Sequence, residues 1–187
     1  MAKIIGKYFI AWIPSSEVIA KVDSIKNSLK DNFGLKYALK SPPHITLKMP
    51  FSWNEAKEHL LIQNLQKFLS HENDFTLDLD GFGKFGKRVI FIKVSRSEEL
   101  VQLQSRLVQH CKQELKLVKE LSDSNYHPHM TIAFKDLKTR AFEEYWNYVC
   151  KLTFCQQNQT GKIVLLKKIE NSWSFFENLK SQDTLIL

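Results

Sequence analysis

Pro43-His44-Ile45-Thr46-Leu47 and Pro128-His129-Met130-Thr131-Ile132 share one pattern: proline, histidine, an apolar residue, threonine and a second apolar residue. Side chains alternate between the two faces of an extended strand. In each segment the histidine and the threonine therefore share one face, and the apolar residues share the other. The pattern predicts two strands, each with an apolar back against the core and an imidazole and a hydroxyl in front.

The segments around these two strands repeat one order of elements. A strand, a helix, the first histidine strand and another helix are predicted at 7–14, 15–32, 44–49 and 54–70. The same order is predicted at 89–94, 97–119, 129–134 and 139–149. Between and after the repeats, the pattern indicates a strand at 75–79, a glycine-rich turn at 81–86 and a closing hairpin at 160–180.

This repetition indicates an internal duplication. We expect one bilobal domain over residues 1–187, with pseudo-repeats at about 4–70 and 82–155. The expected fold class is α+β: two lobes of mostly antiparallel sheet, related by a pseudo-twofold axis, with helices on the outside and a central cleft. Each lobe would then supply one histidine strand to the cleft.

Composition narrows the kind of protein. The formal charge is +7, and most of the excess of lysine lies in the first 70 residues, which favours polyanionic ligands such as RNA or nucleotides. A solvated lysine-rich surface is the alternative reading. No run approaches the ~18 apolar residues of a membrane span, and no signal peptide is evident, so we expect a cytoplasmic protein without a membrane or an obligate protein partner.

Two histidines on either side of one small anion are suited to catalysing the opening of a phosphodiester bond. Hydrolysis needs a proton removed from the attacking water and a proton delivered to the leaving ribose oxygen. Imidazole, with a reference pKa of about 6.5, can do either near neutrality. We therefore expect His44 and His129 to be catalytic and Thr46 and Thr131 to donate to the phosphate oxygens; which histidine is the acid stays open.

Four neighbouring residues are candidates for substrate binding. Lys48 and Lys135 have the strand parity of the motif histidines, so they could line the rim of the cleft, although lysines at strand ends are commonly only solvated. Tyr126 and Phe51 could stack on a base, with core packing as the alternative for Phe51. His127 lacks a nearby acidic or cysteine partner, so no metal site is expected there.

Two His-x-Thr strands in duplicated lobes resemble the two-histidine phosphoesterase superfamily. Within it, residues 44–51 and 128–134 look like the 2′-5′ RNA ligase-like (LigT-like) branch. The resemblance implies a bilobal fold and a reaction without metal or other cofactor, in which 2′,3′-cyclic phosphates or related RNA-end phosphodiesters open to a 2′-phosphate. It also implies catalytic roles for His44 and His129 and phosphate binding by Thr46 and Thr131. A cleft arginine used by some members has no locatable counterpart in this sequence.

The expected function is therefore a phosphoesterase that acts on an RNA terminus or a cyclic nucleotide, with 2′-5′ ligation as the reverse reaction. A cyclic phosphodiesterase for a small nucleotide metabolite is one alternative. A non-catalytic RNA-binding module is another, but binding alone has no need of two titrating groups. Activity on oligonucleotides against mononucleotides separates the first two readings, and RNA binding without turnover would favour the third.

Overall fold

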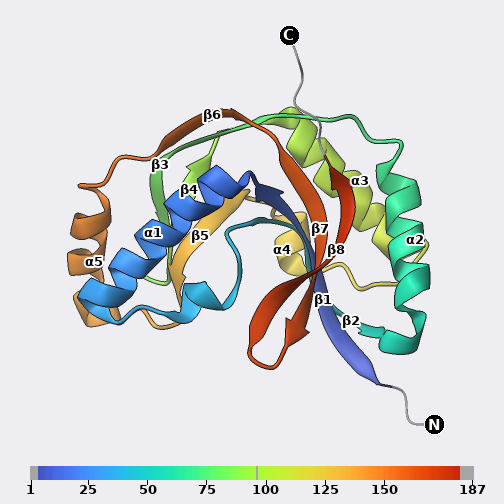
Figure 1. Ribbon diagram of the computed structural model, residues 1–187, viewed down its shortest axis with the longest axis horizontal. Coiled ribbons are helices and arrows are strands. Elements are labelled where there is room, and N and C mark those ends of the chain that lie inside the picture. Colours follow the sequence, from blue (N-terminus) through green and yellow to red (C-terminus); the bar gives the residue numbers. More distant parts are fainter. Residues whose placement is uncertain (1–3, 96, 182–187) are drawn as a thin grey trace.

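The two motif strands lie side by side at the centre of a single eight-stranded sheet, in a computed structural model that describes residues 4–95 and 97–181 (Figure 1). The sheet is antiparallel and strongly curled, and its strand order is β6-β3-β4-β5-β2-β1-β7-β8. The strands are β1 (Ile5–Pro14), β2 (Ile45–Asn54), β3 (Leu77–Phe85), β4 (Val89–Val94), β5 (His129–Phe134), β6 (Cys155–Gln159), β7 (Gly161–Ile169) and β8 (Ser172–Ser181).

Helices lie outside the sheet, and two of the long ones begin at the serines that the sequence indicated. The Ser15 side chain accepts from the Val18 amide at 3.5 Å, and the Ser97 side chain accepts from the Leu100 amide at 3.1 Å. Gly34 ends the first helix with φ of 72°, a left-handed conformation that favours glycine. The helices are α1 (Ser16–Phe33), α2 (Glu58–Leu69), α3 (Glu98–Gln113), α4 (Leu121–Ser124) and α5 (Phe142–Val149), with short 3₁₀ turns η1 (Tyr37–Lys40), η2 (Glu55–Lys57) and η3 (Thr139–Ala141).

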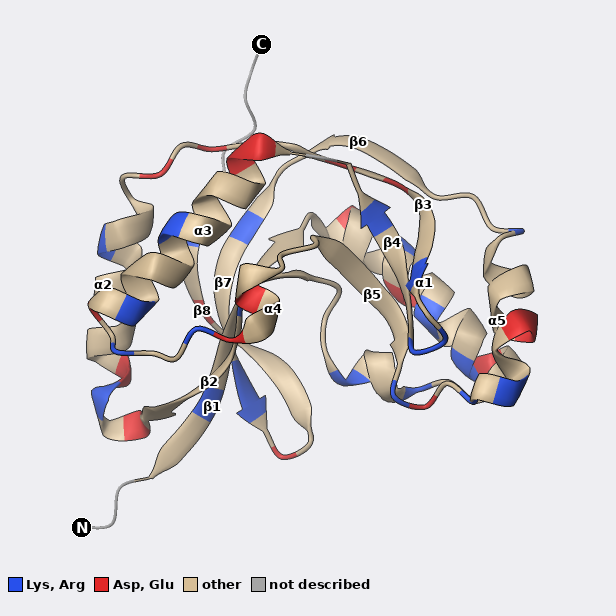
Figure 2. Ribbon diagram, turned by 180° about the vertical axis from the view of Figure 1, so that it is seen from behind, with Lys and Arg blue, Asp and Glu red and all other residues tan. Residues whose placement is uncertain are grey.

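The fold class expected from the sequence is confirmed, but the helices are exchanged between the two halves of the sheet. The order strand, helix, strand, helix occurs as β1-α1-β2-α2 and as β4-α3-β5-α5, and the sheet order is symmetrical about the β2–β5 neighbours. However, α1 packs against β5 and lies beside α5, whereas α3 packs against β2 and lies beside α2 (Figures 1 and 2). Each half of the sheet is therefore covered by a helix from the other repeat. The duplication itself stays a prediction.

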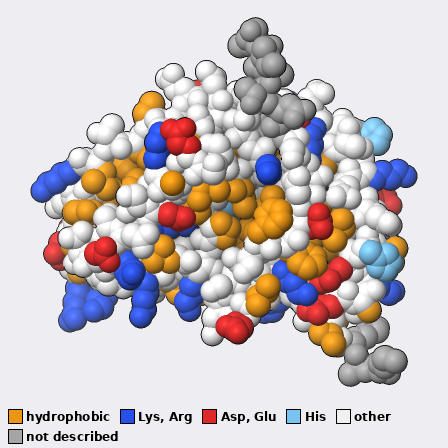
Figure 3. Space-filling model, viewed as in Figure 1, with side chains coloured by type: hydrophobic (Ala, Val, Ile, Leu, Met, Phe, Trp, Pro, Cys, Tyr) orange, Lys and Arg blue, Asp and Glu red, His pale blue; other side chains and the backbone are white. Residues whose placement is uncertain are grey.

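Strand β1 is buried on both of its faces. Tyr8, Ile10 and Trp12 point into the main core. Phe9 belongs to a second, smaller apolar cluster on the opposite face, with Ala11, Ile13, Val164 and Leu166. Ile19 of α1 and Trp173 of β8 pack against this second cluster, and Figure 3 shows hydrophobic side chains gathered between α1 and β7.

Several boundaries and short elements differ from those expected, and β2 runs on to Asn54 beyond the predicted 44–49. Strand β3 continues through the predicted 81–86 turn to Phe85, because a register shift between Leu79 and Phe82 is absorbed at Gly81, whose φ is 63°. Helix α3 ends at Gln113 rather than near 119; Leu117 then turns back into the core. The short elements η1, α4 and β6 were not predicted.

Among the helices of residues 4–95 and 97–181, none combines the length and the hydropathy that crossing a membrane requires.

Candidate active site

The pairing of β2 with β5 brings the two motifs together. Ile45 pairs with Met130 in antiparallel register, and both side chains are buried in the core. The residues before and after this pair therefore lie on the other face, where His44 is opposite Thr131 and His129 is opposite Thr46. Diagonal neighbours of this kind are about 7–8 Å apart. The two imidazoles thus occupy one diagonal of a small square and the two hydroxyls the other, which leaves room for one phosphate between them.

Each imidazole is held by the backbone in the same way. His44 Nδ1 lies 2.7 Å from the carbonyl oxygen of Pro42, and His129 Nδ1 lies 2.6 Å from that of His127. Because a carbonyl oxygen only accepts, Nδ1 must carry the proton in both rings. The neutral tautomer therefore leaves Nε2 with a free lone pair, and the same nitrogen can carry a proton when the ring is charged.

A phenylalanine at the same place in each repeat supports each ring. Phe9 packs against His44 with ring centroids 4.9 Å apart, and Phe91 packs against His129 at 5.2 Å. Phe85 adds an edge contact to His129 at 4.9 Å. Gly83 allows this packing, because a Cβ there would lie 2.5 Å from the Phe91 ring. Aromatic packing on one side and a carbonyl on the other hold each imidazole in a defined orientation.

A buried lysine, Lys26, holds the loop before His44 by a hydrogen bond to its backbone. The Lys26 side chain is 1 % exposed, and its ammonium donates to the carbonyl oxygen of Ser41 at 3.1 Å and lies 3.4 Å from Asp23. Burial lowers the pKa of Lys26, and the Asp23 carboxylate opposes that shift. Lys26 is therefore a positioning residue for the His44 loop, and it contributes positive charge on this side of the site.

Both imidazoles favour the neutral form. Burial lowers the pKa of His44 to about 4, and the charges of Lys26 and His129 act in the same direction, whereas the hydrogen bond to Pro42 opposes them. Burial also lowers the pKa of His129, the hydrogen bond to the His127 carbonyl opposes this, and the charge of His127 adds to it. An anion bound between the rings would favour the protonated form of each.

A cavity of about 700 Å³ opens at the paired motifs and takes its walls from both halves of the sheet. His44, Thr46, His129 and Thr131 all line it. Its basic side chains come from four separate segments. They are Lys7, Lys40, Lys135 and Lys168.

Two of the four substrate-binding candidates line this cavity. Tyr126 lies in its wall with a buried hydroxyl, and burial raises the pKa of that phenol. Lys135 lies at its rim, where its ammonium donates to the Tyr37 hydroxyl at 3.0 Å. Strand parity with His129 is not what brings Lys135 there, because the pairing of β5 with β4 skips Ile132 and Lys135 follows the end of the strand with φ of 66°.

The structure places the other two candidates outside the cavity: the expectation for Lys48 is corrected, and Phe51 takes the core-packing role given as its alternative. A bulge in β2 skips Leu47 in the pairing with β1, which reverses the parity after Thr46 and turns Lys48 into the interior. The Lys48 ammonium there pairs with the Asp123 carboxylate at 2.7 Å. Phe51 packs against Tyr8 in the main core, with centroids 6.1 Å apart, and is not placed to stack on a base.

Several cavity residues were not identified from the sequence. Lys7, Lys40 and Lys168 are ordinary strand or loop lysines in the sequence, and only the curl of the sheet and the exchange of helices bring them to one opening. His127 lines the cavity as well, although it was considered only as a metal ligand. Tyr37, Phe85 and Trp173 add aromatic surface to the walls. Within residues 4–95 and 97–181, no group of three His, Cys, Asp or Glu side chains is placed to hold a metal ion.

A curled antiparallel sheet with paired His-x-Thr strands at its centre defines a LigT-like protein of the two-histidine phosphoesterase class. Solved structures agree on the fold. The chain superposes on a crystal structure titled as a phosphoesterase with a TM-score of 0.61 and 15% identity, over 94% of this chain and 97% of that one. It superposes on E. coli LigT complexed with 3′-AMP with a TM-score of 0.60 and 16% identity, over 94% and 97%.

Sequence comparison identifies the family. A protein of Geobacillus sp. (strain WCH70) that bears the name "Putative phosphoesterase" is 28% identical over 174 residues, which is 91% of this chain and 94% of the relative. A similarly named Bacillus licheniformis protein is 30% identical over 131 residues, 69% of this chain and 71% of the relative. Residues 14–167 match the 2′-5′ RNA ligase superfamily, and the chain belongs to that superfamily.

Proposed function

We propose that this protein opens 2′,3′-cyclic phosphates, or 2′-5′ phosphodiesters, at RNA ends or in nucleotides, with His44 and His129 as the general acid–base pair. The observation that carries the proposal is the symmetrical site: two imidazoles on one diagonal, each with Nδ1 on a carbonyl oxygen and Nε2 available. Ligation to a 2′-5′ linkage is the same ring opening with a ribose 5′-hydroxyl in place of water: the P–O bond to that hydroxyl oxygen forms as the P–O bond to the ribose 3′-oxygen breaks.

The arrangement suits an in-line displacement at phosphorus. One imidazole takes the proton of the attacking water while the other delivers a proton to the ribose oxygen that leaves on the far side. The P–O bond to that oxygen breaks as the bond to the water oxygen forms, and the product is a phosphate monoester. The Thr46 and Thr131 hydroxyls lie on the crossing diagonal, where they can donate to the two non-bridging oxygens as negative charge grows there.

The cavity volume of about 700 Å³ suits a single nucleotide better than a duplex, so a terminal nucleotide or a free cyclic nucleotide would enter it. Structures of E. coli LigT with 3′-AMP and with phosphate support a ligand of this chemistry. The basic rim also favours an anionic substrate.

The proposal is tested with a panel of substrates. Protein stripped of metal with a chelator is incubated with 2′,3′-cyclic mononucleotides, with short oligonucleotides ending in a cyclic phosphate and with 2′-5′ linked dinucleotides. Products are identified by mass. Turnover to a 2′-phosphate supports the proposal, and the relative rates on mononucleotides and oligonucleotides separate a metabolite from an RNA end. Absence of turnover on every member, together with retained RNA binding, would favour the non-catalytic alternative.

The lowered pKa values predict an acidic optimum for kcat/KM. Activity needs one neutral and one protonated imidazole, and this form of the pair peaks between the two pKa values, whichever ring is the acid. The rising limb is therefore expected near pH 4, from His44, and the falling limb below the reference value of 6.5, from His129. A pH series of kcat/KM on a cyclic mononucleotide measures both limbs. A pH optimum of kcat/KM above neutrality would contradict the lowered pKa values of the two histidines.

Replacing either threonine by valine should slow the chemical step. Valine keeps the β-branched shape but removes the donor, and loss of one preorganised donor to a developing oxyanion costs about 10²–10³ in kcat in a well-studied protease. We expect roughly 10²-fold for Thr46→Val and for Thr131→Val, with KM changed much less. Serine at the same position keeps the hydroxyl and serves as the matched control. Equal losses in the serine and valine variants would argue for a packing role instead.

A further inference from the structure

Three lysines gather around one tyrosine at the rim of the cavity; we call this group, Tyr37 with Lys40, Lys135 and Lys168, the Tyr37 cluster. The Lys135 ammonium donates to the Tyr37 hydroxyl at 3.0 Å and lies 4.7 Å from the ring centroid. The Lys40 ammonium lies 5.0 Å from the same centroid. The hydrogen bond from Lys135 lowers the pKa of Tyr37, and the charges of Lys40 and Lys168 add to that shift.

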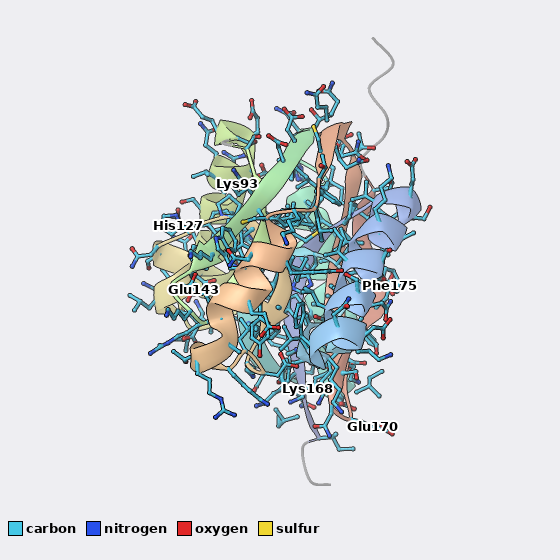
Figure 4. The ribbon with its side chains drawn as sticks, turned by 90° about the vertical axis from the view of Figure 1, so that its left-hand side faces the viewer. Lys93, His127, Glu143, Lys168, Glu170 and Phe175 are labelled. Atoms are coloured by element: carbon cyan, nitrogen blue, oxygen red, sulfur yellow. The ribbon has the colours of Figure 1, made fainter. Side chains whose placement is uncertain are left out.

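The cluster joins segments that are far apart in the sequence. Tyr37 and Lys40 belong to η1, Lys135 follows β5, and Lys168 is near the end of β7. Figure 4 shows Lys168 near Glu170 at the hairpin end of the molecule. Three separate segments therefore bring positive charge to one side of the cavity mouth.

Backbone features fix the cluster in place. Lys135 has φ of 66°, a left-handed conformation that is uncommon for a residue with a side chain and that occurs often at functional positions. The next residue, Asp136, accepts from the Lys36 and Tyr37 amides at 2.7 and 2.6 Å. The two residues after β5 thus hold both the backbone and the hydroxyl of Tyr37, and the cluster is a built feature rather than a chance gathering of surface lysines.

The positive charge of the cluster is not balanced by ion pairs. Across the described ranges 4–95 and 97–181, none of the three ammonium groups has a carboxylate oxygen within 4.0 Å, whereas Lys48, Lys167 and Lys180 all do. Asp136 lies beside the cluster, but its bonded oxygen is engaged by the two backbone amides. Three neighbouring ammonium groups, none of them in an ion pair, favour a multiply charged anion.

The cluster belongs to other parts of the cavity wall than the motif strands that carry the imidazoles. Lys135 follows the end of β5, six residues beyond His129, Tyr37 and Lys40 belong to η1, and Lys168 belongs to β7. The two imidazoles and the two threonine hydroxyls leave room between them for only one phosphate. We infer that the Tyr37 cluster binds a second phosphate group of the same substrate, so that the preferred substrate carries a phosphate beyond its cyclic end.

This inference rests on the proposed function and refines its substrate class. The second phosphate could be the 5′-phosphate of a mononucleotide or the internucleotide phosphate of an RNA end, and the cluster recognises the chemistry common to both. Lysine is a point charge with rotatable donors, which suits a phosphate approached from several loops.

The test compares three substrates: adenosine 2′,3′-cyclic phosphate, the same compound with a 5′-phosphate, and the adenosine dinucleotide ending in a cyclic phosphate. We expect the native protein to favour each substrate that carries a second phosphate by roughly tenfold in kcat/KM, the effect of one good charge-assisted contact. A preference for the 5′-phosphate compound indicates a nucleotide metabolite, and a preference for the dinucleotide indicates an RNA end. Either preference should shrink when the ionic strength is raised about tenfold.

Substitutions test whether the Tyr37 cluster causes the preference for a second phosphate. Lys40→Ala and Lys135→Ala should each reduce the ratio of kcat/KM values toward one, and Tyr37→Phe, which removes only the hydroxyl, should reduce it in part. Lys151→Ala, an exposed lysine outside the cavity, is the control and should leave the ratio unchanged. Circular dichroism checks that each variant folds. A native ratio near one, or a ratio that survives both lysine substitutions, would overturn the inference while leaving the proposed function intact.

Failure of the proposed function gives a different result. If no substrate is turned over, binding of adenosine 2′,5′-bisphosphate and of adenosine 2′-phosphate is compared by calorimetry instead. Tighter binding of the bisphosphate that is lost in Lys135→Ala would still support the cluster. Equal binding of the two compounds would reject it.

Discussion

His44→Ala and His129→Ala are each expected to lower kcat on a 2′,3′-cyclic nucleotide by roughly 10³–10⁴. A positioned general acid or base contributes typically 10²–10⁴-fold, and both rings here are oriented by a carbonyl oxygen and an aromatic neighbour. The two effects should not add in the double variant, because the acid and the base act in one concerted step. Initial rates at substrate concentrations around KM give kcat and KM separately.

The control for this prediction is another histidine of the same chain. His59 is exposed on α2 and does not line the cavity, so His59→Ala should keep native kcat. Binding of a nucleoside 2′-phosphate should survive in both catalytic variants, because the threonines remain. Either catalytic variant with more than about a tenth of native kcat would contradict a general acid–base role for that ring.

The second large effect is on stability. Asp123→Ala is expected to lower the free energy of unfolding by about 3–5 kcal/mol, because it leaves the Lys48 ammonium buried without a counterion. Both side chains are 1 % exposed. The Lys48 ammonium also donates to the Val118 carbonyl at 3.0 Å, and Asp123 accepts from the Met49 amide at 3.1 Å. Urea unfolding followed by circular dichroism measures the change.

Comparison variants separate the buried pair from a general effect of charge. Replacing both partners by apolar residues, Lys48→Met with Asp123→Leu, should recover much of the lost stability, since no unpaired charge remains. The exposed pair of Lys21 with Glu17 is the matched control, and Lys21→Met should cost no more than about 0.5 kcal/mol. A loss below about 1 kcal/mol for Asp123→Ala would mean that water reaches the site and the pair is not truly buried.

This pair also connects the two motifs. Lys48 follows the first motif in β2, and Asp123 lies in α4 just before the second. On the other side, Asp136 follows the second motif and holds the η1 backbone just before the first. β2 and β5 share only one pair in the described ladder, Ile45 with Met130. The two polar connections therefore help to hold the strands in the register on which the square of histidines and threonines depends.

The local sequence pattern was sufficient to predict the centre of the site. The His-x-Thr alternation predicts which face of the strand each motif residue occupies. The antiparallel pairing of β2 with β5 then brings the two polar faces together. The caps at Ser15 and Ser97 and the end of α1 at Gly34 also follow from short-range chemistry. These features depend on a few neighbouring residues, so they can be predicted from the sequence.

Features set by distant contacts were not predictable in this way. The bulge in β2 arises from pairing with β1, and it moved Lys48 from the expected cleft to the core. The end of α3 has no glycine or proline to mark it and depends on Leu117 packing inward. The exchange of α1 and α3 between halves leaves no local signal, yet it helps to decide which lysines meet at the cavity.

The most direct test of the central claim, two imidazoles presenting Nε2 to one anion, is long-range ¹H–¹⁵N NMR of the histidine side chains. Spectra of the native protein are recorded with and without a nucleoside 2′-phosphate, with His44→Ala and His129→Ala for assignment. We predict that both rings carry the proton on Nδ1 in the free protein, and that both Nε2 resonances shift together when the ligand binds. Protonation on Nε2 in either free ring, or a ligand that shifts only one of the two, would contradict the shared site.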